Sequence, residues 1–516
     1  MAVRRELSGS LPLVQDTRHS LLRIRSGDLA KLEKHVYQRY PRREWGTFFE
    51  FGYRRTSWGL ALSYVGGLWP GPGDMDRQVG LTRFLDQYSR RAFHHTAVST
   101  LGVGVVHSHP EECCTFPSPT DDDMDGYFAR EFGAYGKRKP YCSLVLQRNP
   151  TTGFTFTGRV YDRGEWLPVE KLLTVGDQIE LFSSEAEEPR PVTMGTSEVT
   201  RARLVSVLGQ PSAVRLARAT AGIIGCSGTG SPAGHVLARA GVGNFILVDP
   251  KRFANSNLER THGSSFDHID REPSPYKVEI VADLIKSINP NANITTLAGN
   301  VLQENVIDEL LRCDVLLGCT DTQHGRAKLS DLAQHYLLPS VDLGVLMEGQ
   351  SGRLTSQISD IMIYSPDFPC AFCSGRIDGI ELSNELMSDE ERSRRQIEAK
   401  EAAERGDDPD QYWRQRPRQM HTVGYLTTML GALGAGYAEG LLTGTFGPPH
   451  PWFQFDISRE RLGVVAPHRD RLAGCSCGRY GGWGDAAKPY RNVVIPNHWP
   501  KHAILLSRGG SHFFSK

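Results

Sequence analysis

Residues 219–230 read Ala-Thr-Ala-Gly-Ile-Ile-Gly-Cys-Ser-Gly-Thr-Gly, and this stretch decides the fold of the C-terminal half. Its apolar first part predicts a short strand, and its glycines predict a tight turn that opens a helix. Residues 231–240 then have helical spacing, and residues 244–249 form a second apolar run that ends in an acid. Strand, glycine turn, helix and strand in this order predict a βαβ unit. The glycines of such a turn let the backbone and the helix N-terminus approach a phosphate group.

The same alternation continues toward the C-terminus. Strand-like runs at residues 315–318 and 340–345 alternate with helical stretches, which predicts a Rossmann-like, doubly wound, mostly parallel sheet over residues 200–480. Residues 383–419 are highly charged and are expected to form a helical excursion or a mobile crossover segment. Residues 422–444 are rich in Gly, Ala and Leu and should return the chain to a packed helix.

The N-terminal third has a different pattern of apolar and polar residues. Residues 1–182 mix short apolar runs with turns, which predicts a mixed α/β domain with a central sheet. The polar, proline-bearing residues 183–199 are the expected linker between the two domains. Residues 481–516 form a C-terminal tail without a clear pattern. The predicted fold class is therefore α/β for both domains.

The composition is that of an ordinary globular protein. The 516 residues suggest two or three domains. Lys plus Arg and Asp plus Glu both number 59, so the net charge is zero, which argues against broad binding to nucleic acid or to an anionic membrane. No apolar run approaches the length of a membrane span, and residues 1–8 lack the apolar core of a signal peptide. The ten cysteines are too sparse for a disulfide scaffold, so we expect a cytoplasmic location.

Two histidines form the first candidate site. His107 and His109 are two residues apart, so on a strand both imidazoles project from one face toward one ion. Asp121 adds a carboxylate and leaves the fourth position of a zinc ion open, as in catalytic zinc sites. Bound zinc lowers the pKa of a coordinated water toward about 7. Glu44 is the candidate proton shuttle, and Ser118 can donate a hydrogen bond to the developing oxyanion.

The order Glu44, His107-Ser108-His109-Pro110, Ser118 and Asp121 resembles the E…HxHP…SxxD motif of the JAMM (MPN-type) metallo-isopeptidases. The resemblance implies zinc on the two histidines and the aspartate, with the glutamate as general acid/base and the serine at the oxyanion site. The context of Glu44 looks like the first strand of that family, and Glu50 is the alternative.

Charged and polar residues downstream of the glycine turn form the second candidate site. Arg260 and Lys277 can neutralise phosphate oxygens, and Asp321 at the end of a later strand can hold magnesium. Asn257 offers a polar donor near an α-phosphate, and Asp249 can bind ribose hydroxyls. A glycine turn alone is also compatible with a dehydrogenase, but hydride transfer requires none of these groups. The set therefore favours phosphoryl chemistry.

This set resembles the ThiF/MoeB-type adenylyltransferases, the superfamily of the ubiquitin-activating enzymes. The matching positions, in chain order, are Gly225, Gly228, Gly230, Asp249, Ser256-Asn257-Leu258-Glu259-Arg260, Lys277, Thr320-Asp321 and Arg326. The resemblance implies that the C-terminal carboxylate of a ubiquitin-like protein attacks the α-phosphate of magnesium-bound ATP, which yields an acyl-adenylate and pyrophosphate. Two positions depart from the family pattern: Ser227 replaces the usual glycine, and Lys251 stands where a second acid is common.

The resemblance also bears on assembly and on acyl transfer. Family members are usually dimers or pseudodimers, so a homodimer is expected. An arginine ahead of the first strand reaches the partner's ATP in that family, and Arg203 or Arg201 is the matching candidate. Many members pass the acyl group to a downstream cysteine, but residues 374–474 contain none, which excludes a thioester there. The adenylate is then either released directly to a partner or passed to a hydroxyl such as that of Thr422.

Two close cysteine pairs indicate a further metal site. Cys370 with Cys373 and Cys475 with Cys477 can supply four thiolates to a tetrahedral structural zinc. The same superfamily often carries a structural zinc held by two cysteine pairs in this region. The second pair here has one intervening residue instead of the usual two.

Together the two resemblances predict a bifunctional enzyme of a ubiquitin-like pathway. The N-terminal domain would trim the modifier's tail or cleave its isopeptide conjugates, and the C-terminal domain would adenylate the exposed terminal glycine. Both sites would grip one tail, and a tether raises its effective concentration. A conjugating enzyme is the expected second partner, and such fusions resemble bacterial ubiquitin-like operons, several of which serve antiviral defence. Three alternatives remain open: a sulfur-carrier adenylyltransferase, a Rossmann oxidoreductase, and an inactive binding scaffold in either domain.

Overall fold

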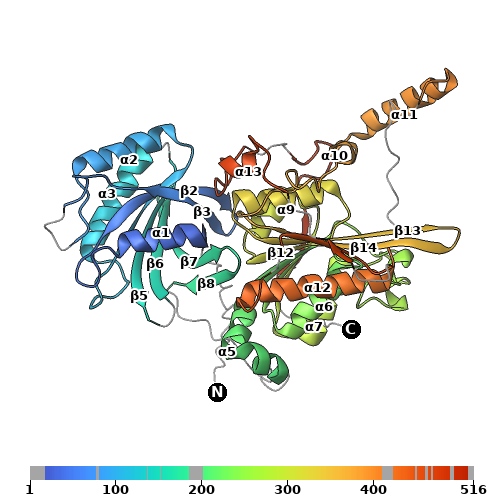
Figure 1. Ribbon diagram of the computed structural model, residues 1–516, viewed down its shortest axis with the longest axis horizontal. Coiled ribbons are helices and arrows are strands. Elements are labelled where there is room, and N and C mark those ends of the chain that lie inside the picture. The colour runs from blue at the N-terminus through green and yellow to red at the C-terminus, as the bar shows by residue number, and fades with distance from the viewer. Residues whose placement is uncertain are drawn as a thin grey trace, which may run out of the picture.

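The computed structural model describes residues 18–508 apart from residues 77–80, 136–137, 151–152, 185–200, 409–421, 448–449, 459–462, 466–468 and 489–492. Most of the linker expected at 183–199, and residues 409–419 of the charged segment, therefore lie outside the described residues. Across the described chain, no helix combines the length and the apolar character that a membrane span requires. Figure 1 shows two α/β bodies side by side, the N-terminal one in blue and cyan and the C-terminal one in green to red.

The first body is built on an eight-stranded sheet. Its strands are β1 (His19–Arg25), β2 (Gly46–Thr56), β3 (Gly59–Leu68), β4 (Gly102–Ser108), β5 (Tyr141–Asn149), β6 (Gly153–Asp162), β7 (Glu165–Val175) and β8 (Ile179–Ser183). They lie in the order β1-β3-β2-β4-β5-β6-β7-β8, and β1 also pairs with β7, so the sheet curls back on itself. Strand β4 is antiparallel to β2 and parallel to β5. The mixed α/β fold predicted for this part of the chain is confirmed.

Helices cover both faces of this sheet. Helix α1 (Ser26–Val36) buries its apolar side in one core cluster, which also contains Phe49 of β2. Helices α2 (Asp86–Val98) and α3 (Pro119–Tyr135) pack in a second cluster, which contains Phe48. The neighbours Phe48 and Phe49 belong to different clusters because successive side chains of a strand point to opposite faces.

The second body is built on a nine-stranded sheet in the order β16-β15-β14-β13-β12-β9-β10-β11-β17. Its strands are β9 (Thr220–Ile224), β10 (Asn244–Val248), β11 (Asn293–Ala298), β12 (Val315–Gly318), β13 (Ser340–Gln350), β14 (Arg353–Tyr364), β15 (Trp452–Asp456), β16 (Gly463–Val465) and β17 (Ile504–Arg508). The helices around it are α5 (Ala202–Arg218), α6 (Gly230–Ala240), α7 (Lys277–Ile288), α8 (Glu304–Leu310), α9 (Gln323–His335), α10 (Gly379–Glu385), α11 (Asp389–Glu404), α12 (Gly424–Thr443) and α13 (Ser476–Arg479).

The sheet is parallel only in its centre, which differs from the mostly parallel sheet predicted from the sequence. Strands β11, β10, β9, β12 and β13 run parallel, whereas β14, β15 and β16 on one side and β17 on the other are antiparallel to their neighbours. The direction reverses after β13 because Ser351 and Gly352 both have positive φ angles, 54° and 79°, which close a tight hairpin instead of a helical crossover. The tail beyond residue 480 also joins this sheet, through β17.

Side chains of the N-terminal body reach deep into the C-terminal one. Arg23 on β1 is fully buried and donates hydrogen bonds to the carbonyl oxygens of Leu311 and Cys313, at 2.7 and 2.8 Å. The indole of Trp58 donates to the carbonyl oxygen of Asp308 at 2.7 Å. A Cβ atom on Gly52 of β2 would lie 2.2 Å from the carbonyl oxygen of Gly482, so the tail passes directly against this strand. The two bodies therefore pack as one unit.

Arg54 on β2 contacts three acidic residues of the C-terminal body. Its Nε lies 2.7 Å from Asp308, its Nη1 lies 3.1 Å from Asp485, and Glu304 accepts a further hydrogen bond. Burial raises the pKa of Asp308, and Arg54 opposes that shift. Without the arginine, this half-buried carboxylate would keep its desolvation cost and lose its partner.

Replacing Arg54 with alanine is therefore expected to lower the free energy of unfolding by roughly 1–3 kcal/mol. Urea denaturation followed by circular dichroism measures this loss. Arg90 is the matched control, because its side chain is 80% exposed and pairs with the exposed Asp86. Arg90→Ala should leave the transition unchanged, and equal transitions for Arg54→Ala and the unmodified protein would contradict the prediction.

Candidate functional site

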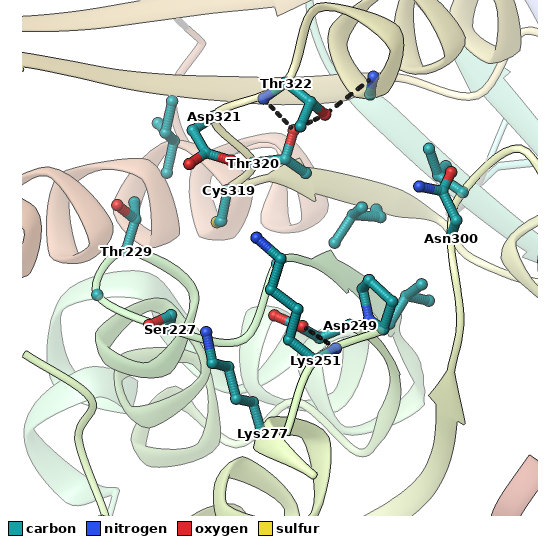
Figure 2. A pocket seen from close by; sticks show the side chains of 18 of the residues that line it. Ser227, Thr229, Asp249, Lys251, Lys277, Asn300, Cys319, Thr320, Asp321 and Thr322 are labelled. Carbon is teal, nitrogen blue, oxygen red and sulfur yellow. Dashed lines mark hydrogen bonds between the residues drawn. The ribbon is translucent and has the colours of Figure 1, made fainter. Parts of the chain in front are cut away.

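A cavity of about 590 Å³ lies at the carboxyl ends of β9, β10 and β12. In open α/β sheets this crevice is where ligands bind. The predicted residues that line it are Gly225, Gly228, Asp249, Asn257, Arg260, Lys277, Asp321 and Arg326. Figure 2 shows Ser227 and Thr229 of the glycine turn, Asp249, Lys277 and Asp321 around this space. The fold thus brings together residues that lie about a hundred positions apart in the chain, from Gly225 to Arg326.

The glycine turn depends on two glycines for its shape. Gly225 has a φ of +96°, and a Cβ there would lie 2.5 Å from the carbonyl oxygen of Cys319. A Cβ on Gly230, the first residue of α6, would lie 1.9 Å from the carbonyl oxygen of Gly225. Ser227, which replaces the glycine usual in the ThiF/MoeB-type enzymes, fits in the turn. Its hydroxyl lies 3.2 Å from that of Thr261. The turn residues that line the cavity, Gly225, Ser227, Gly228 and Thr229, lie directly ahead of α6, so the N-terminal end of this helix is beside the cavity.

Asp249 stands at the end of β10, as predicted, and is held by backbone donors. One carboxylate oxygen accepts from the Cys226 N–H at 2.9 Å, and the other accepts from the Lys251 N–H at 2.8 Å. Burial raises the pKa of Asp249, and Lys277 opposes that shift. Each carboxylate oxygen has a second lone pair that a hydroxyl group can use.

Cationic side chains line the cavity, among them Lys277, Lys251 and Arg260. Lys277 is buried at the start of α7, and burial lowers its pKa while Asp249 acts in the opposite direction. Lys251, which departs from the family pattern, also lines the cavity, and Figure 2 shows both lysine side chains extending into it. Arg260 lies beside the glycine turn, where a Cβ on Gly228 would be 3.0 Å from its Cδ. Glycine at this position therefore keeps the arginine close to the turn.

The remaining predicted residues occupy the other walls. Asp321 is exposed to the cavity, and Figure 2 shows it across the space from Lys277. Asn257 is buried in the 3-10 turn η1 (Asn255–Asn257), where its Oδ1 accepts from the Ala254 N–H at 3.1 Å. Arg326 on α9 is buried, with its Nε 3.7 Å from Asp342.

The two arginines ahead of β9 lie outside this cavity. Arg203 is exposed near the start of α5, and it is not among the lining residues. Arg201 packs against Gly241, where a Cβ would lie 2.3 Å from its guanidinium, and burial lowers its pKa. Neither arginine lines this cavity, so the role of one of them in a partner's site stays a prediction.

Two nucleophile candidates line the cavity. Cys319 follows β12, and burial raises the pKa of its thiol, which disfavours a reactive thiolate. Thr422 also lines the cavity, ahead of α12. The hydroxyl named as an alternative acyl acceptor is thus near the predicted reaction site.

The structure adds residues that sequence reasoning did not assign to the site. Asn300, His324 and Trp499 line the end of the cavity away from the glycine turn. Asn300 follows β11, which is another parallel strand of the sheet. Because ligands bind at the carboxyl ends of such strands, this position could have marked Asn300 as a site residue. No local pattern marks Trp499, because it comes from the tail and reaches the cavity only through tertiary packing.

The predicted histidine cluster is assembled in the N-terminal body. Ligand atoms of His107, His109 and Asp121 lie within 4.8 Å of one another, and all three residues are buried. Asp121 is 3.2 Å from His107 Nε2 and 3.3 Å from His109 Nε2. Burial acts against ionisation, but the two histidines beside it and the Ser118 hydroxyl hold the pKa of Asp121 well below its usual range.

The histidine environment fits a metal ion. His109 Nδ1 lies 2.5 Å from the carbonyl oxygen of Cys114, which makes Nδ1 the protonated nitrogen and leaves the Nε2 lone pair directed at the cluster. Both nitrogens of His107 and Nε2 of His109 are buried without a hydrogen-bond partner of ordinary geometry among the described residues. Buried nitrogens without partners are unfavourable, and a cation would satisfy those that carry a lone pair.

Ser118 lies beside Asp121 in a capping arrangement. Its Oγ donates to the Asp121 carboxylate at 2.7 Å and accepts from the Asp121 N–H at 3.3 Å, just ahead of α3. The Ser118 N–H donates to the same carboxylate at 2.7 Å. The serine therefore orients the third candidate ligand, and the predicted oxyanion contact would require its hydroxyl to turn away from Asp121.

Glu44 and Glu50 lie in different surroundings. Glu44 is buried two residues ahead of β2, and its Oε2 accepts from the Thr82 N–H at 2.9 Å. Gly46 pairs with His107 across the sheet, and the charge of Glu44 acts on His109. Glu50 instead contacts His95 of α2 at 2.8 Å. The structure thus brings Glu44, and not Glu50, to the histidine cluster.

The four cysteines form a second compact cluster. Cys370 Sγ lies 3.7 Å from Cys475 Sγ, and Cys373 Sγ lies 3.7 Å from Cys477 Sγ. These separations are far longer than a disulfide bond of about 2.05 Å. They match the edge of about 3.8 Å of a tetrahedron with zinc–sulfur bonds of about 2.3 Å. All four sulfur atoms lie within 4.8 Å of one another and all four residues are buried, so the cluster fits a structural zinc ion.

Replacing Cys477 with serine is expected to lower the zinc bound per chain by one atom and to lower the melting temperature. Elemental analysis of the purified protein measures the zinc, and a thermal scan measures the stability. Cys113→Ser is the matched control, because Cys113 is exposed and lies outside the cluster. Unchanged zinc content in a folded Cys477→Ser protein would rule out this site.

A family model described as the ThiF family matches residues 199–477. Curated relatives include the molybdopterin-synthase adenylyltransferase of Haemophilus influenzae, 32% identical over 147 residues, a match that spans 28% of this chain and 56% of the relative. The SAMP-activating enzyme E1 of Haloferax volcanii is 27% identical over 171 residues, a match that spans 33% of this chain and 58% of the relative. Adenylyltransferase and sulfurtransferase UBA4 of Candida glabrata is 31% identical over 167 residues, a match that spans 32% of this chain and 35% of the relative. The chain thus spans between 35% and 58% of the length of these relatives.

Solved structures include Escherichia coli MccB with ATP. It has 16% sequence identity and a TM-score of 0.40, and the match covers 54% of this chain and 74% of that chain.

Proposed function

Because the chain belongs to the ThiF family through residues 199–477, we propose that it uses ATP to adenylate the C-terminal carboxylate of a ubiquitin-like or sulfur-carrier protein. Relatives named as a molybdopterin-synthase adenylyltransferase and a SAMP-activating enzyme support this class of reaction. The observation that carries the proposal is one cavity that gathers Arg260, Lys277 and Asp321 in front of the glycine turn.

The proposed reaction is an in-line displacement at phosphorus. A carboxylate oxygen of the protein substrate attacks the α-phosphorus of ATP, and the bond from that phosphorus to the bridging oxygen breaks. Pyrophosphate leaves with the electron pair, and an acyl-adenylate remains. Lys277, Lys251 and Arg260 neutralise the phosphate oxygens, and the glycine turn donates backbone hydrogen bonds to them. Asp321 is the residue that would hold magnesium, which supplies further charge neutralisation when bound.

The roles of the other site residues follow from their positions. Asp249 binds the ribose hydroxyls, Asn257 shapes the turn beside the α-phosphate, and Arg326 supports the opposite wall. In a homodimer, Arg203 would complete the partner's site. The product is an activated acyl group that a partner accepts, either a conjugating enzyme or a sulfur donor.

The fate of the adenylate separates the two substrate classes. Conjugation would produce an isopeptide on a lysine, whereas sulfur transfer would produce a thiocarboxylate on the protein substrate. Residues 374–474 contain no cysteine, so neither route uses a thioester there. Mass spectrometry of the chain incubated with ATP, magnesium and a small β-grasp protein encoded beside it distinguishes the two products. Absence of any adenylate would overturn the proposal.

A second activity is proposed for the N-terminal body: zinc-dependent cleavage of the modifier's tail or of its isopeptide conjugates. The cluster of His107, His109 and Asp121, with Glu44 beside it, supports this JAMM-type proposal. A zinc ion held there would activate a water molecule. Glu44 would take a proton during attack and return it to the leaving amine. Ser118 orients Asp121, and its hydroxyl is the candidate donor to the oxyanion.

A further inference from the structure

The end of the nucleotide cavity away from the glycine turn has a wall formed by Asn300, His324 and Trp499. Figure 2 shows Asn300 on one side of the cavity, with Ser227 and Thr229 on the other side and Asp249 between them. Under the proposed function the turn faces the phosphates and Asp249 faces the ribose. This wall therefore lies where the base of the nucleotide would sit.

His324 is fixed in one orientation within this wall. Its Nδ1 lies 2.7 Å from the Glu385 carboxylate of α10, and its Nε2 lies 3.0 Å from Asn300 Nδ2. The Asn300 amide is itself oriented, since its Oδ1 accepts from the Leu302 N–H at 3.0 Å. Asn300 Nδ2 is thus the donor toward His324, which makes Nε2 an acceptor and places the imidazole hydrogen on Nδ1.

Trp499 packs against this fixed imidazole. The two ring centroids are 5.3 Å apart, with an edge-to-face angle of 71°. The indole is half-buried and faces the cavity, so one part of it rests on the protein while another part is available to a ligand. Edge-to-face packing of this kind holds an aromatic side chain in one position.

Hydrogen bonds on the C-terminal side of Trp499 attach the tail to the body beside the cavity. The Trp499 N–H donates to the carbonyl oxygen of Pro496 at 3.1 Å, which forms a turn. Gln303 Nε2 donates to the carbonyl oxygen of Pro500 at 2.6 Å. Asn305 exchanges two hydrogen bonds with the backbone of Ala503, at 2.9 and 3.0 Å, just before β17 pairs with β11. The tryptophan therefore follows a local turn, and the chain directly after it is held by Gln303 and Asn305.

We propose that Trp499 forms the base-binding wall of the ATP site, with its indole packed against the adenine ring, and that His324 is its positioning residue. The inference rests on the proposed function, because it assigns the base end of that same site. A large aromatic surface provides an apolar contact for a nucleobase without a hydrogen-bond pattern of its own. The tail beyond residue 480 thereby becomes part of the nucleotide site.

The experiment compares ATP with inorganic triphosphate as ligands of the full chain, measured by calorimetry and by tryptophan fluorescence. Trp499→Ala is expected to weaken ATP binding by about 5- to 150-fold, the range that follows from the loss of one base–aromatic contact. Trp499→Phe should retain most of the affinity, which guards against a folding defect. Trp166→Phe is the matched control, because Trp166 is an exposed residue of β7 in the other body.

Triphosphate binding should be the same in all variants, because this ligand has no base. ATP should change the fluorescence of the unmodified protein and of Trp166→Phe but not of Trp499→Phe. His324→Ala should raise the KM for ATP more than it lowers kcat. Equal ATP affinity of Trp499→Ala and the unmodified chain would overturn the inference while leaving the adenylation proposal in place. An unmodified chain that binds neither ATP nor triphosphate would overturn both.

Discussion

Replacing Asp321 with alanine is expected to lower ATP–pyrophosphate exchange by at least about 100-fold, because the charge that develops on the leaving pyrophosphate loses the residue that would hold its magnesium ion. The side chain is exposed to the cavity and lies across from Lys277, so its removal should not disturb the core. Exchange of labelled pyrophosphate into ATP, with the cognate β-grasp protein present, measures the effect.

Asp267→Ala is the control for this change. Asp267 is an exposed acid on the 3-10 turn η2 (Phe266–His268), and it does not line the cavity. Because its side chain carries the same charge, this variant shows the effect of removing one carboxylate outside the cavity. Full exchange activity in Asp321→Ala would show that this acid does not serve adenylation.

Replacing Glu44 with glutamine is expected to lower cleavage of the modifier's tail by about 100- to 10,000-fold, because an amide cannot shuttle the proton that hydrolysis requires. The side chain keeps its size, and its oxygen can still accept from the Thr82 N–H. Release of a reporter fused to the tail of the β-grasp protein measures cleavage. ATP–pyrophosphate exchange should be unaffected, since Glu44 lies in the other body.

Glu50→Gln is the matched control for the cleavage assay. Glu50 lies on the adjacent strand β2 and contacts His95 rather than the histidine cluster. Cleavage should therefore persist in this variant. Loss of both activities from either Asp321→Ala or Glu44→Gln, in a folded protein, would refute two separate sites.

The amino-acid sequence by itself was sufficient for features that depend on short-range spacing. The two-residue step from His107 to His109 brings both rings together where β4 ends, with His109 directly after the last residue of the strand, and the three-residue step from Ser118 to Asp121 places a cap next to its helix. Glycine at position 230 is required by the turn itself, because a Cβ atom there would lie 1.9 Å from the carbonyl oxygen of Gly225. Such features depend on residues within one or two adjacent elements, so a short stretch of sequence is enough to predict them.

Tertiary structure decided what depends on segments that are far apart in the chain. The choice between Glu44 and Glu50 required the pairing of β2 with β4, and the antiparallel edges of the second sheet required the hairpin after β13 and the return of the tail as β17. Trp499 enters the nucleotide cavity because Gln303 and Asn305 hold the tail, about two hundred residues away in sequence. Contacts of this kind arise from the packing of whole elements, and the local sequence around either partner carries no pattern that specifies the other.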